Sequence, residues 1–401
     1  MKNYDFLIVG AGIFGISAAL ELRKTGFSVC VLNPTEGPDP LAAGTDISKV
    51  IRMEYGSDEE YLDMTRESMQ IWREWNELFE EIFYHEGHYI LLSAQALDTE
   101  EDTYEKISYQ HVSKRGIPLE RIGYEEFKSR FPAYNPKAFV EGSFNKEGGY
   151  VESGRIVQRL NQYAVEIGIE SLTEGAKSIW IENNQAKGVV TTKGTKISAA
   201  HTIVCAGNFT PFLVPDLKPY MKITGHPVFH LKASNPELYE AERFPVFAAD
   251  IANTGWYGFP LHPIEKVVKV AKHGLGLELD PAKDERKVYE SDIQELREFL
   301  SFAFPKLAND PIVYTRRCCY TDTLDGHFWI DQHPEIRGLS IGSGGSGHGM
   351  KMGPVVGQII AAVAQGNDHK WAARYRWREL NEATAQMEEA RYLLKRNLGK
   401  Q

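Results

Sequence analysis

Residues 4–33 follow a strand–turn–helix–strand pattern that constrains the fold more than any other part of the chain. An apolar run, residues 4–9, is typical of a strand buried on both faces. It leads into the motif GAGIFG, which has the spacing G-x-G-x-x-G, and a helix is predicted over residues 13–25. A second strand is predicted over residues 27–32. This complete β-α-β unit predicts a doubly wound sheet that binds a dinucleotide.

The three glycines of the motif each have a predicted role. Gly10 permits a tight turn, Gly12 lets the backbone approach a pyrophosphate, and Gly15 lets the helix pack on the strand. The helix N-terminus adds N–H groups and a partial positive charge. The second strand leads to Asn33, where such units usually have an acidic residue that binds a ribose. Asn33 is still predicted as a ribose contact, through its carbonyl oxygen.

The rest of the chain divides into segments with different patterns. Ser57 begins a capping box that predicts the start of a helix with one apolar face, and Ser153 is predicted to cap another helix. Residues 220–316 alternate apolar and polar side chains as an antiparallel sheet does, with a helix predicted at about 291–303. After Gly366 the chain is charged, and it is predicted to be helical and to lie on the surface.

Composition restricts the partners of this chain. With 401 residues and 42% hydrophobic residues, the chain is long enough for a globular protein of two domains, or of one large domain with an insertion. A net charge of -10 argues against nucleic acid or an anionic membrane as the main partner. The four cysteines do not form a disulfide framework, which favours a reducing compartment, and we expect a cytoplasmic protein. No run reaches the roughly 20 apolar residues needed to span a bilayer.

The stretch Arg317–Met352 is the second informative region. It contains the adjacent cysteines Cys318 and Cys319, an apolar strand, a Gly/Ser-rich turn and Lys351. The residue pattern predicts a strand, a hairpin, another strand and a glycine turn that leads into a helix. Taken alone, such cysteines are as consistent with a structural role as with a chemical one. A lysine beside a glycine-rich turn is more often solvated than functional.

Five motifs occur along the chain in the order GAGIFG, KVIRMEYG, WYGFP, CCYTDTLDGHF and GGSGHGMK. In this order they resemble the FAD-dependent amine oxidases, which include monomeric sarcosine oxidase, pipecolate oxidase and fructosyl amino acid oxidase (amadoriase), and the resemblance extends to about residue 366. It implies a mixed α/β (α+β) fold, in which a Rossmann-like FAD-binding domain is combined with a discontinuous antiparallel-sheet substrate domain. The predicted boundaries are residues 1–90, 145–219 and 320–370 for the FAD-binding domain, 91–144 and 220–319 for the substrate domain, and 371–401 for a C-terminal helical tail.

The resemblance also implies how the cofactor is held. The cysteine of the family motif, here Cys318, is joined covalently to FAD, with Cys319 as the neighbouring alternative. A thiolate is the attacking species, so a locally positive site would favour the linkage. Tyr320 belongs to the same motif. The glycine turn is expected to cross the flavin, with His348 orienting this loop; its cofactor-binding residues are Gly344, Gly345, Ser346, Gly347 and His348.

By the same resemblance, Lys351 and Arg52 bind the substrate carboxylate through charge-assisted hydrogen bonds. Asp46, Lys49 and Glu54 are expected to face the substituent on the substrate nitrogen. Lys49 stands where sarcosine oxidases have a second arginine. The spacing of Asp46 and Lys49 is closer to the fructosyl and saccharopine-type members, which argues against sarcosine as the main substrate.

Lys269 best matches the family lysine that stands over the flavin and promotes its reaction with oxygen, with Lys266 and Lys272 as competing candidates. A fixed positive charge in a dry site stabilises developing superoxide. Tyr257 and His273 are predicted to form walls of the same pocket. No metal ligand is assigned.

The sequence therefore predicts an oxidase of N-substituted α-amino acids that acts as a monomer or small homo-oligomer on a small amine and O2. A hydride equivalent passes from the carbon next to nitrogen to flavin N5, the imine is hydrolysed, and O2 becomes hydrogen peroxide. Sarcosine, pipecolate, saccharopine and fructosyl amino acids all remain open as substrates. The alternatives are an amine dehydrogenase or natural-product tailoring oxidase on the same fold, a non-catalytic flavin-binding protein, and an NAD-binding protein that uses only the N-terminal motif.

Overall fold

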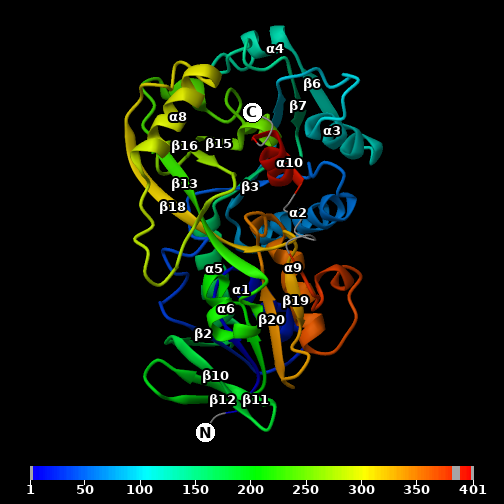
Figure 1. Cartoon of the computed structure of the whole chain (residues 1–401), viewed down its shortest axis with the longest axis vertical. Helices are drawn as coiled ribbons and strands as arrows, with labels where there is room; N and C mark the ends of the chain where they lie inside the picture. Colours follow the sequence, from blue (N-terminus) through cyan, green and yellow to red (C-terminus); the bar gives the residue numbers. More distant parts are fainter. Residues whose placement is uncertain (1–2, 382–388, 399–401) are drawn as a thin grey trace.

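The molecule is elongated and has a large sheet in each half (Figure 1). The structure, a computed structural model, describes residues 3–381 and 389–398. The described chain begins at the far end of one half, called here the lower half, and its last helix packs on the other, upper half. The predicted mixed α/β fold is confirmed by these two sheets and the helices around them.

The lower half is built on a sheet whose central strands are parallel. Its order is β10-β11-β12-β1-β2-β9, with β20 beside β12 and β19 beside β20. β1 (Asn3–Val9) pairs in parallel with both β2 (Val29–Asn33) and β12 (Lys196–Val204). Because α1 (Ile13–Lys24) connects β1 to β2, the predicted β-α-β unit is confirmed. The other strands are β9 (Glu170–Thr173), β10 (Ala176–Glu182), β11 (Gln185–Thr191), β19 (Trp329–Gln332) and β20 (Leu339–Ser343).

Helices α9 (Gly353–Ala364), α2 (Glu59–Phe79) and α5 (Ser153–Glu166) cover this region, with α9 packed against both α1 and α2. The apolar face predicted for α2 is buried and includes Trp72, whose indole N–H donates to the Lys351 carbonyl at 2.9 Å. Two predicted caps are wrong. Asp58 caps α2, because the Ser57 hydroxyl instead bonds Glu389. Ser153 is the first residue of α5 and not its cap.

The upper half contains the second sheet, in the order β17-β13-β16-β15-β14-β5-β7-β6, with β18 beside β13. The predicted antiparallel pairing is confirmed except between β14 and β5, which run parallel. α8 (Glu290–Ala303) was predicted at almost the same residues. The strands are β5 (Tyr89–Ser93), β6 (Leu119–Ile122), β7 (Glu141–Asn145), β13 (Met221–Leu231), β14 (Val246–Ala249), β15 (Trp256–Leu261), β16 (Val268–Lys272), β17 (Leu277–Glu278) and β18 (Ile312–Thr323).

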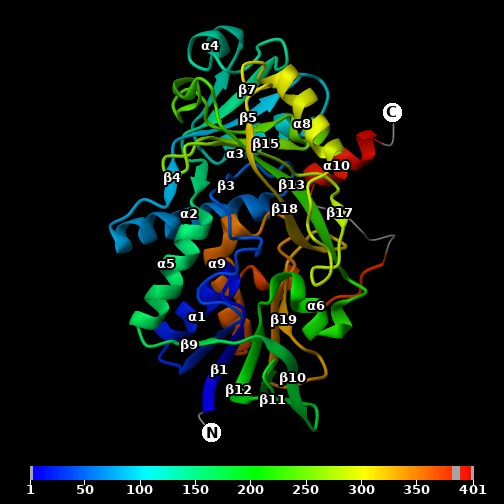
Figure 2. The ribbon, with the colours of Figure 1, turned by 90° about the vertical axis from the view of Figure 1, so that its left-hand side faces the viewer.

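The long antiparallel pair β13–β18 runs from the upper sheet toward the lower half (Figure 2). Because side chains alternate along a strand, Cys318, Tyr320 and Asp322 share one face of β18 and Cys319 lies on the other. A small sheet made of β3 (Lys49–Ile51), β8 (Gly149–Val151) and β4 (Tyr84–Glu86) lies between the halves. The remaining short elements are α3 (Tyr104–Lys114), α4 (Tyr124–Ser129), α6 (Thr210–Leu213), α7 (Ile251–Thr254), η1 (Gly207–Phe209), η2 (Pro215–Leu217), η3 (Pro236–Tyr239) and η4 (Met350–Met352).

The C-terminal segment differs from the predicted helical tail. It forms a short 3-10 turn, η5 (Ala372–Tyr375), then residues 376–381 without helix, and finally α10 (Glu389–Leu398). α10 packs on α7 and its Arg391 is only 2% exposed, so it is not simply a solvated surface helix. Residues 382–388 and 399–401 of the predicted tail lie outside the described residues. None of the described helices combines the length and apolar character needed to cross a membrane.

Candidate active site

The glycine turn after β1 has the geometry of a dinucleotide cradle. Gly10 has φ +107°, and a Cβ there would lie 2.4 Å from the carbonyl oxygen of Cys205, just after β12, so only glycine fits. A Cβ on Gly15 would lie 2.0 Å from the Gly10 carbonyl oxygen, so the third glycine allows α1 to pack this closely. A Cβ on Gly12, by contrast, would meet nothing within 4 Å among the described residues beyond its own helix and chain neighbours. The N-terminus of α1 is therefore open to a pyrophosphate, which fits FAD.

Asn33 supports this turn from the end of β2. Its Oδ1 accepts the backbone N–H of Ala11 at 3.2 Å, and its Nδ2 donates to the Gly37 carbonyl at 2.7 Å. The side chain thus ties the glycine turn to the loop after β2. A carboxylate could accept from Ala11 but could not donate to Gly37, which gives a structural reason for an amide at this position. Its contact with a ribose stays a prediction.

A cavity of about 60 Å³ lies between the two halves and brings together eight of the predicted site residues. Its walls come from β3, β15, β18, the end of β16 and the turn that leads into η4. The lining residues are Lys49, Val50, Arg52, Ala248, Ile251, Tyr257, His273, Tyr320, Gly347, His348, Met350 and Lys351. A second cavity is larger, at about 310 Å³. Of all the residues considered for the site, only Lys272 lines it, and Lys272 is the alternative to Lys269. We therefore take the smaller cavity, where the cations and aromatic side chains converge, as the candidate active site.

Arg52 and Lys351 both line this cavity and both contact the Tyr55 ring. Each of the two cationic residues is only 5% exposed. The Arg52 guanidinium carbon lies 4.9 Å and the Lys351 ammonium 5.1 Å from the centre of the Tyr55 ring. Lys351 also donates to the Tyr55 hydroxyl at 2.9 Å, and Arg52 donates to the Tyr104 hydroxyl at 3.1 Å. Two buried cations that line one cavity form a site suited to a carboxylate.

The predicted flavin loop is a tight turn with left-handed backbone. Gly344 and Gly347 adopt φ of +73° and +77°, which glycine does without strain, and Ser346 between them has φ +44°, which is uncommon for a residue with a side chain. A Cβ on Gly347 would lie 2.4 Å from the Tyr320 ring, so glycine lets this loop contact β18. The Ser346 hydroxyl accepts the Thr323 N–H at 3.2 Å. A Cβ on Gly345, between them, would have no such close contact, since its nearest atom would lie 3.9 Å away.

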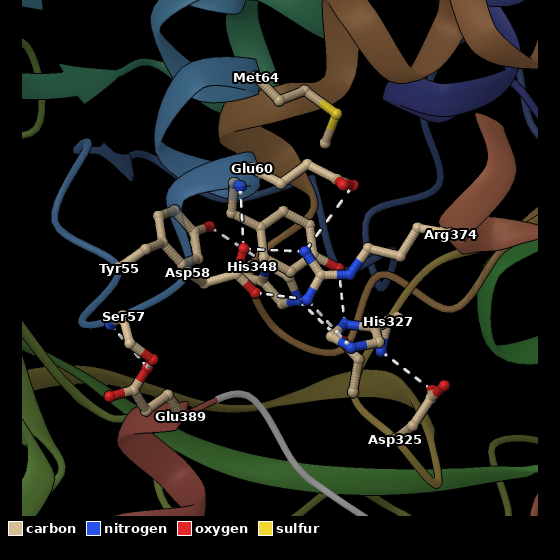
Figure 3. A network of polar contacts seen from close by, with 12 residues as sticks. Tyr55, Ser57, Asp58, Glu60, Met64, Asp325, His327, His348, Arg374 and Glu389 are labelled. Atoms are coloured by element: carbon tan, nitrogen blue, oxygen red, sulfur yellow. Dashed lines mark hydrogen bonds and ion pairs between the residues drawn. The ribbon is translucent and has the colours of Figure 1, made fainter. Parts of the chain in front are cut away.

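His348 has both ring nitrogens within hydrogen-bonding distance of fixed partners. Nδ1 lies 3.2 Å from the Tyr55 hydroxyl and Nε2 lies 3.0 Å from the Gly326 carbonyl. Figure 3 shows His348 beside Tyr55 in this network. The arrangement suits a residue that orients the loop. His273 directly follows β16, and its backbone N–H donates to the Gly255 carbonyl at 2.6 Å. Its ring centroid lies 5.9 Å from that of Tyr320.

Lys269 lies beside the cavity in a buried charge cluster with Asp46 and Lys49. The Lys269 ammonium is 2.8 Å from the Asp46 carboxylate and also bonds the Ser48 carbonyl. Lys49 is 3.5 Å from the same carboxylate. Burial lowers the pKa of Lys269 to about 8, although the Asp46 charge opposes this shift. Burial would raise the pKa of Asp46, but Lys269 and Lys49 outweigh it and hold that pKa well below its usual range.

The two adjacent cysteines have different surroundings. The Cys318 sulfur accepts from the Lys49 ammonium at 3.7 Å and shares a face of β18 with Tyr320. Burial would lower the pKa of Lys49, but the Cys318 and Asp46 charges outweigh it and raise that pKa. Cys319 faces the opposite side, and burial raises the pKa of its thiol. Of the two cysteines, Cys318 is the one placed beside the Lys49 ammonium.

Two predicted substrate-binding residues do not line the cavity. Glu54 is fully buried and accepts from the Asn145 amide at 2.8 Å, and burial raises its pKa. Asp46 is turned toward Lys269. The sequence reasoning missed Tyr55 and Tyr104, which hold the two cations. Tyr55 stands in the KVIRMEYG motif three residues after Arg52, a signal that was present, whereas nothing local marks Tyr104.

Comparison with known proteins shows the family to which the chain belongs. Residues 5–363 match the DAO family, described as FAD dependent oxidoreductase. The chain is 26% identical over 424 residues to L-saccharopine oxidase of Schizosaccharomyces pombe, with 94% of each chain covered. It is 25% identical over 371 residues to monomeric sarcosine oxidase of Bacillus sp. (strain B-0618), covering 90% of this chain and 92% of that one.

The fold is also similar to that of fructosyl amine: oxygen oxidoreductase (Amadoriase I) from Aspergillus fumigatus. The TM-score is 0.77 at 23% identity, covering 94% of this chain and 90% of that one. The predicted resemblance to the sarcosine oxidase and amadoriase group is confirmed. Since the family match spans residues 5–363 and the glycine cradle fits the cofactor, the chain belongs to the DAO family and is an FAD-dependent oxidoreductase.

Proposed function

We propose that this protein is an FAD-dependent oxidase of N-substituted α-amino acids. The observation that carries the proposal is the pair of buried cations, Arg52 and Lys351, which line one cavity and share the contact with Tyr55. Bidentate binding by an arginine and a second charge from a lysine suit a carboxylate better than a neutral amine. The named activities of the saccharopine and sarcosine oxidases point to the same substrate class.

When bound, FAD would accept a hydride equivalent from the substrate carbon next to nitrogen and pass the electrons to O2, which yields hydrogen peroxide. The residues of this chain supply positioning and charge. Gly10, Gly12 and Gly15 would hold the pyrophosphate, while Arg52 and Lys351 would hold the substrate carboxylate. Tyr257, Tyr320 and Ile251 line the same cavity and would exclude water from the rest of the substrate.

Lys269 is the proposed cation for the reaction with oxygen. It is 1% exposed, so its charge acts in a dry site, where electrostatic stabilisation is strong. Lys49 is proposed to favour the Cys318 thiolate and hence a covalent link between this sulfur and FAD, since the Lys49 ammonium lies 3.7 Å from the sulfur. All four cysteines are free and buried, in keeping with the proposed cytoplasmic, reducing location.

An amine dehydrogenase is the second candidate, and one contact favours it. The Asp46 carboxylate lies 2.8 Å from the Lys269 ammonium and reduces the net field of that cation. A weaker field would slow the reduction of O2 and leave another electron acceptor as the better partner. Lys49, 3.5 Å from the same carboxylate, restores a net positive charge to the cluster, and for this reason we favour the oxidase.

The test is a screen for peroxide release with sarcosine, pipecolate, saccharopine, N-methyl aromatic amino acids and fructosyl amino acids. Each substrate is paired with the corresponding amine that lacks the carboxylate. We expect one group of acids to release one peroxide per amine oxidised, and its carboxylate-free partner to react poorly. Substrate oxidation without peroxide would favour the dehydrogenase. Equal rates for each acid and its carboxylate-free partner would contradict the proposed binding mode.

A further inference from the structure

Arginine–aspartate pairs tie the C-terminal segment to the start of α2, to β18 and to the turn that follows β18. Arg374 Nη1 lies 2.8 Å from Asp58 Oδ1 at the start of α2. Figure 3 shows the two residues of this pair. Arg378 Nε lies 2.7 Å from Asp325 Oδ2, in the turn that follows β18. These contacts are partly exposed at the arginine. The third pair, made by α10, is different because it is buried.

Arg391 of α10 inserts its whole guanidinium into the upper half. Nη1 and Nη2 each lie 2.8 Å from one oxygen of Asp322, so the pair is bidentate. Nε donates to the Gly274 carbonyl at 2.9 Å, and Nη2 also lies 3.4 Å from the Leu275 carbonyl. Both carbonyls belong to the loop that directly follows His273. The planar guanidinium of an arginine has N–H donors on two edges and can bond all of these acceptors at once, which the ammonium of a lysine cannot do.

A short polar chain connects Asp322 to the active-site cavity. The Thr224 hydroxyl donates to Asp322 Oδ2 at 2.5 Å and lies 2.9 Å from Nε2 of His226. The His226 ring stacks on Tyr320, with centroids 3.9 Å apart and planes 21° apart. Tyr320 lines the cavity and meets the glycine loop at Gly347. The buried arginine is thus linked to an active-site wall through four consecutive contacts.

The apolar face of α10 reaches the same wall from another side. Ala390 belongs to the buried cluster that contains Ala248 and Ile251, both of which line the cavity. Leu394 packs closely on Gly255, since a Cβ on this glycine would lie 3.1 Å from the Leu394 side chain. The Gly255 carbonyl accepts the backbone N–H of His273, which follows β16 and lines the cavity. Figure 2 shows α10 lying along the upper half beside this region.

We propose that Arg391 is a positioning residue for the substrate pocket. By pairing with Asp322 it holds α10 against α7, and it holds Tyr320 and the loop after His273 in the arrangement that closes the cavity. α10 therefore supports the pocket wall from behind, and it lies beyond residue 363, where the family match ends. The inference rests on the proposed function for the identity of the substrate, but the anchoring itself is independent of it.

The test uses the holoenzyme and acetate, a carboxylate that carries no substituent, and follows the flavin absorbance. In Arg391→Met, Asp322 is left buried without its counter-charge, so the pocket wall should loosen. We expect acetate to bind about tenfold more weakly. Limited chymotrypsin digestion should also release fragments that end at Leu393 or Leu394, which the wild-type protein protects. The control is Lys395→Met, which removes an exposed cation from the same helix and should bind acetate like the wild type.

Arg391→Lys keeps the charge but loses the bidentate geometry, and it should weaken acetate binding by about threefold. This variant carries the test if Arg391→Met does not fold. Unchanged acetate binding in the folded variants or continued protection of α10 would each overturn the proposal. If the wild-type flavin does not respond to acetate, the proposed carboxylate site fails, and the protection of α10 from digestion decides the proposal. If the wild type oxidises no amine while the acetate effect is found, only the proposed function fails. If amines are oxidised and acetate binding is unchanged, only this inference fails.

Discussion

The buried contact between Lys269 and Asp46 is the residue-scale feature with the most direct bearing on oxygen chemistry. A lysine that is 1% exposed would lose its charge more easily than one in water, and the carboxylate 2.8 Å away counteracts that loss. The balance leaves the pKa of Lys269 lowered, at about 8. The charge of Lys269 is therefore sensitive to pH in a range where the protein can be studied.

Replacing Lys269 distinguishes the two steps of the proposed reaction, flavin reduction by the substrate and flavin reoxidation by O2. In Lys269→Met, we expect flavin reduction by the substrate to stay within a few-fold of the wild type, while reoxidation by O2 falls by about 10²–10³-fold, because the stabilising charge is gone. Stopped-flow absorbance of each half-reaction measures this. Lys272→Met, on the same strand but paired with Glu295 at the surface, is the control and should leave both rates unchanged. Fast reoxidation in Lys269→Met would assign the role to another cation.

The lowered pKa of Lys269 also predicts a pH profile. Below about pH 8 the side chain carries its proton and its positive charge, and above it the charge is lost. We therefore expect the reoxidation rate in the wild type to fall as pH rises through about 8, and the profile of Lys269→Met to be flat over the same range. The measurement is the rate of reoxidation in air-saturated buffer from pH 6 to 10. A wild-type rate that rises with pH would contradict this assignment.

The neighbouring cysteines allow a second residue-scale test. Since Lys49 lies 3.7 Å from the Cys318 sulfur and Cys319 faces away, we expect Cys318→Ser to release its flavin into the supernatant on acid denaturation. Cys319→Ser should retain the colour in the precipitate. Absorbance of the two fractions at the flavin band measures the outcome. Release of flavin from the wild type would show that no covalent bond forms.

At the scale of elements, the glycine turn between β1 and α1 makes a prediction that distinguishes structure from binding. Gly10→Ala places a methyl group 2.4 Å from a carbonyl oxygen at φ +107°, and we expect it to reduce the free energy of unfolding by about 1–3 kcal/mol. Gly12→Ala has open space around its Cβ and should change stability by only about 1 kcal/mol.

The same open space is where a phosphate would lie, so Gly12→Ala should nevertheless bind FAD more weakly than the wild type. Urea unfolding of the apoprotein and FAD titration followed by protein fluorescence measure the two effects. Equal loss of stability in both variants, or normal FAD binding in Gly12→Ala, would contradict the assigned roles.

Elements defined by local pattern were predicted well, and those defined by distant partners were not. The unit β1–α1–β2 depends on an apolar run, a glycine motif and a helix of ordinary length, all of which are local. The cap of α2 was misassigned to Ser57 because its hydroxyl is occupied by Glu389, 332 residues away. α10 was expected to be solvated because its sequence is charged, yet the charge of Arg391 is buried against Asp322, 69 residues earlier.

The same limit applies to the site. Arg52 and Lys351 line one cavity, where the family motifs that contain them placed both, and Tyr320, predicted as a cofactor contact, lines it as well. Glu54 lies two residues after Arg52, but its carboxylate turns to Asn145, 91 residues away. No local pattern reveals which side of a chain segment faces a partner that distant.

At the scale of the whole molecule, the active site is formed by segments from both halves. Tyr257 and Tyr320 come from β15 and β18 of the upper sheet, whereas Gly347 and His348 follow β20 of the lower sheet, so neither half contains a complete site. The cofactor would lie across this junction, held by the glycine turn in the lower half and by Cys318 on β18. A ligand that bridges two halves stabilises the folded molecule as a unit.

This bridging predicts that FAD contributes to global stability. In Cys318→Ser, where FAD would bind only non-covalently, the unfolding free energy should rise with added FAD by about 2.7 kcal/mol at a hundredfold excess over Kd. Thermal unfolding at several FAD concentrations measures this. The wild type, if its flavin is linked, should show no such dependence. A single melting temperature for Cys318→Ser at all concentrations would show that FAD does not bridge the fold.

Because Cys318 and Cys319 are adjacent on β18, the cysteine that would bond the flavin depends on the register of this strand. In the paired ladder Cys318 lies opposite His226 and Cys319 opposite Gly225, and the two thiols point to opposite faces. A slip of one residue between β13 and β18 would exchange the thiol that Lys49 meets. If FAD is bonded to a cysteine, peptide mapping would show which of the two carries it, and hence the register that β18 had in each molecule. Misaligned chains in a refolded or redesigned preparation could be counted in this way after the fold itself has been destroyed.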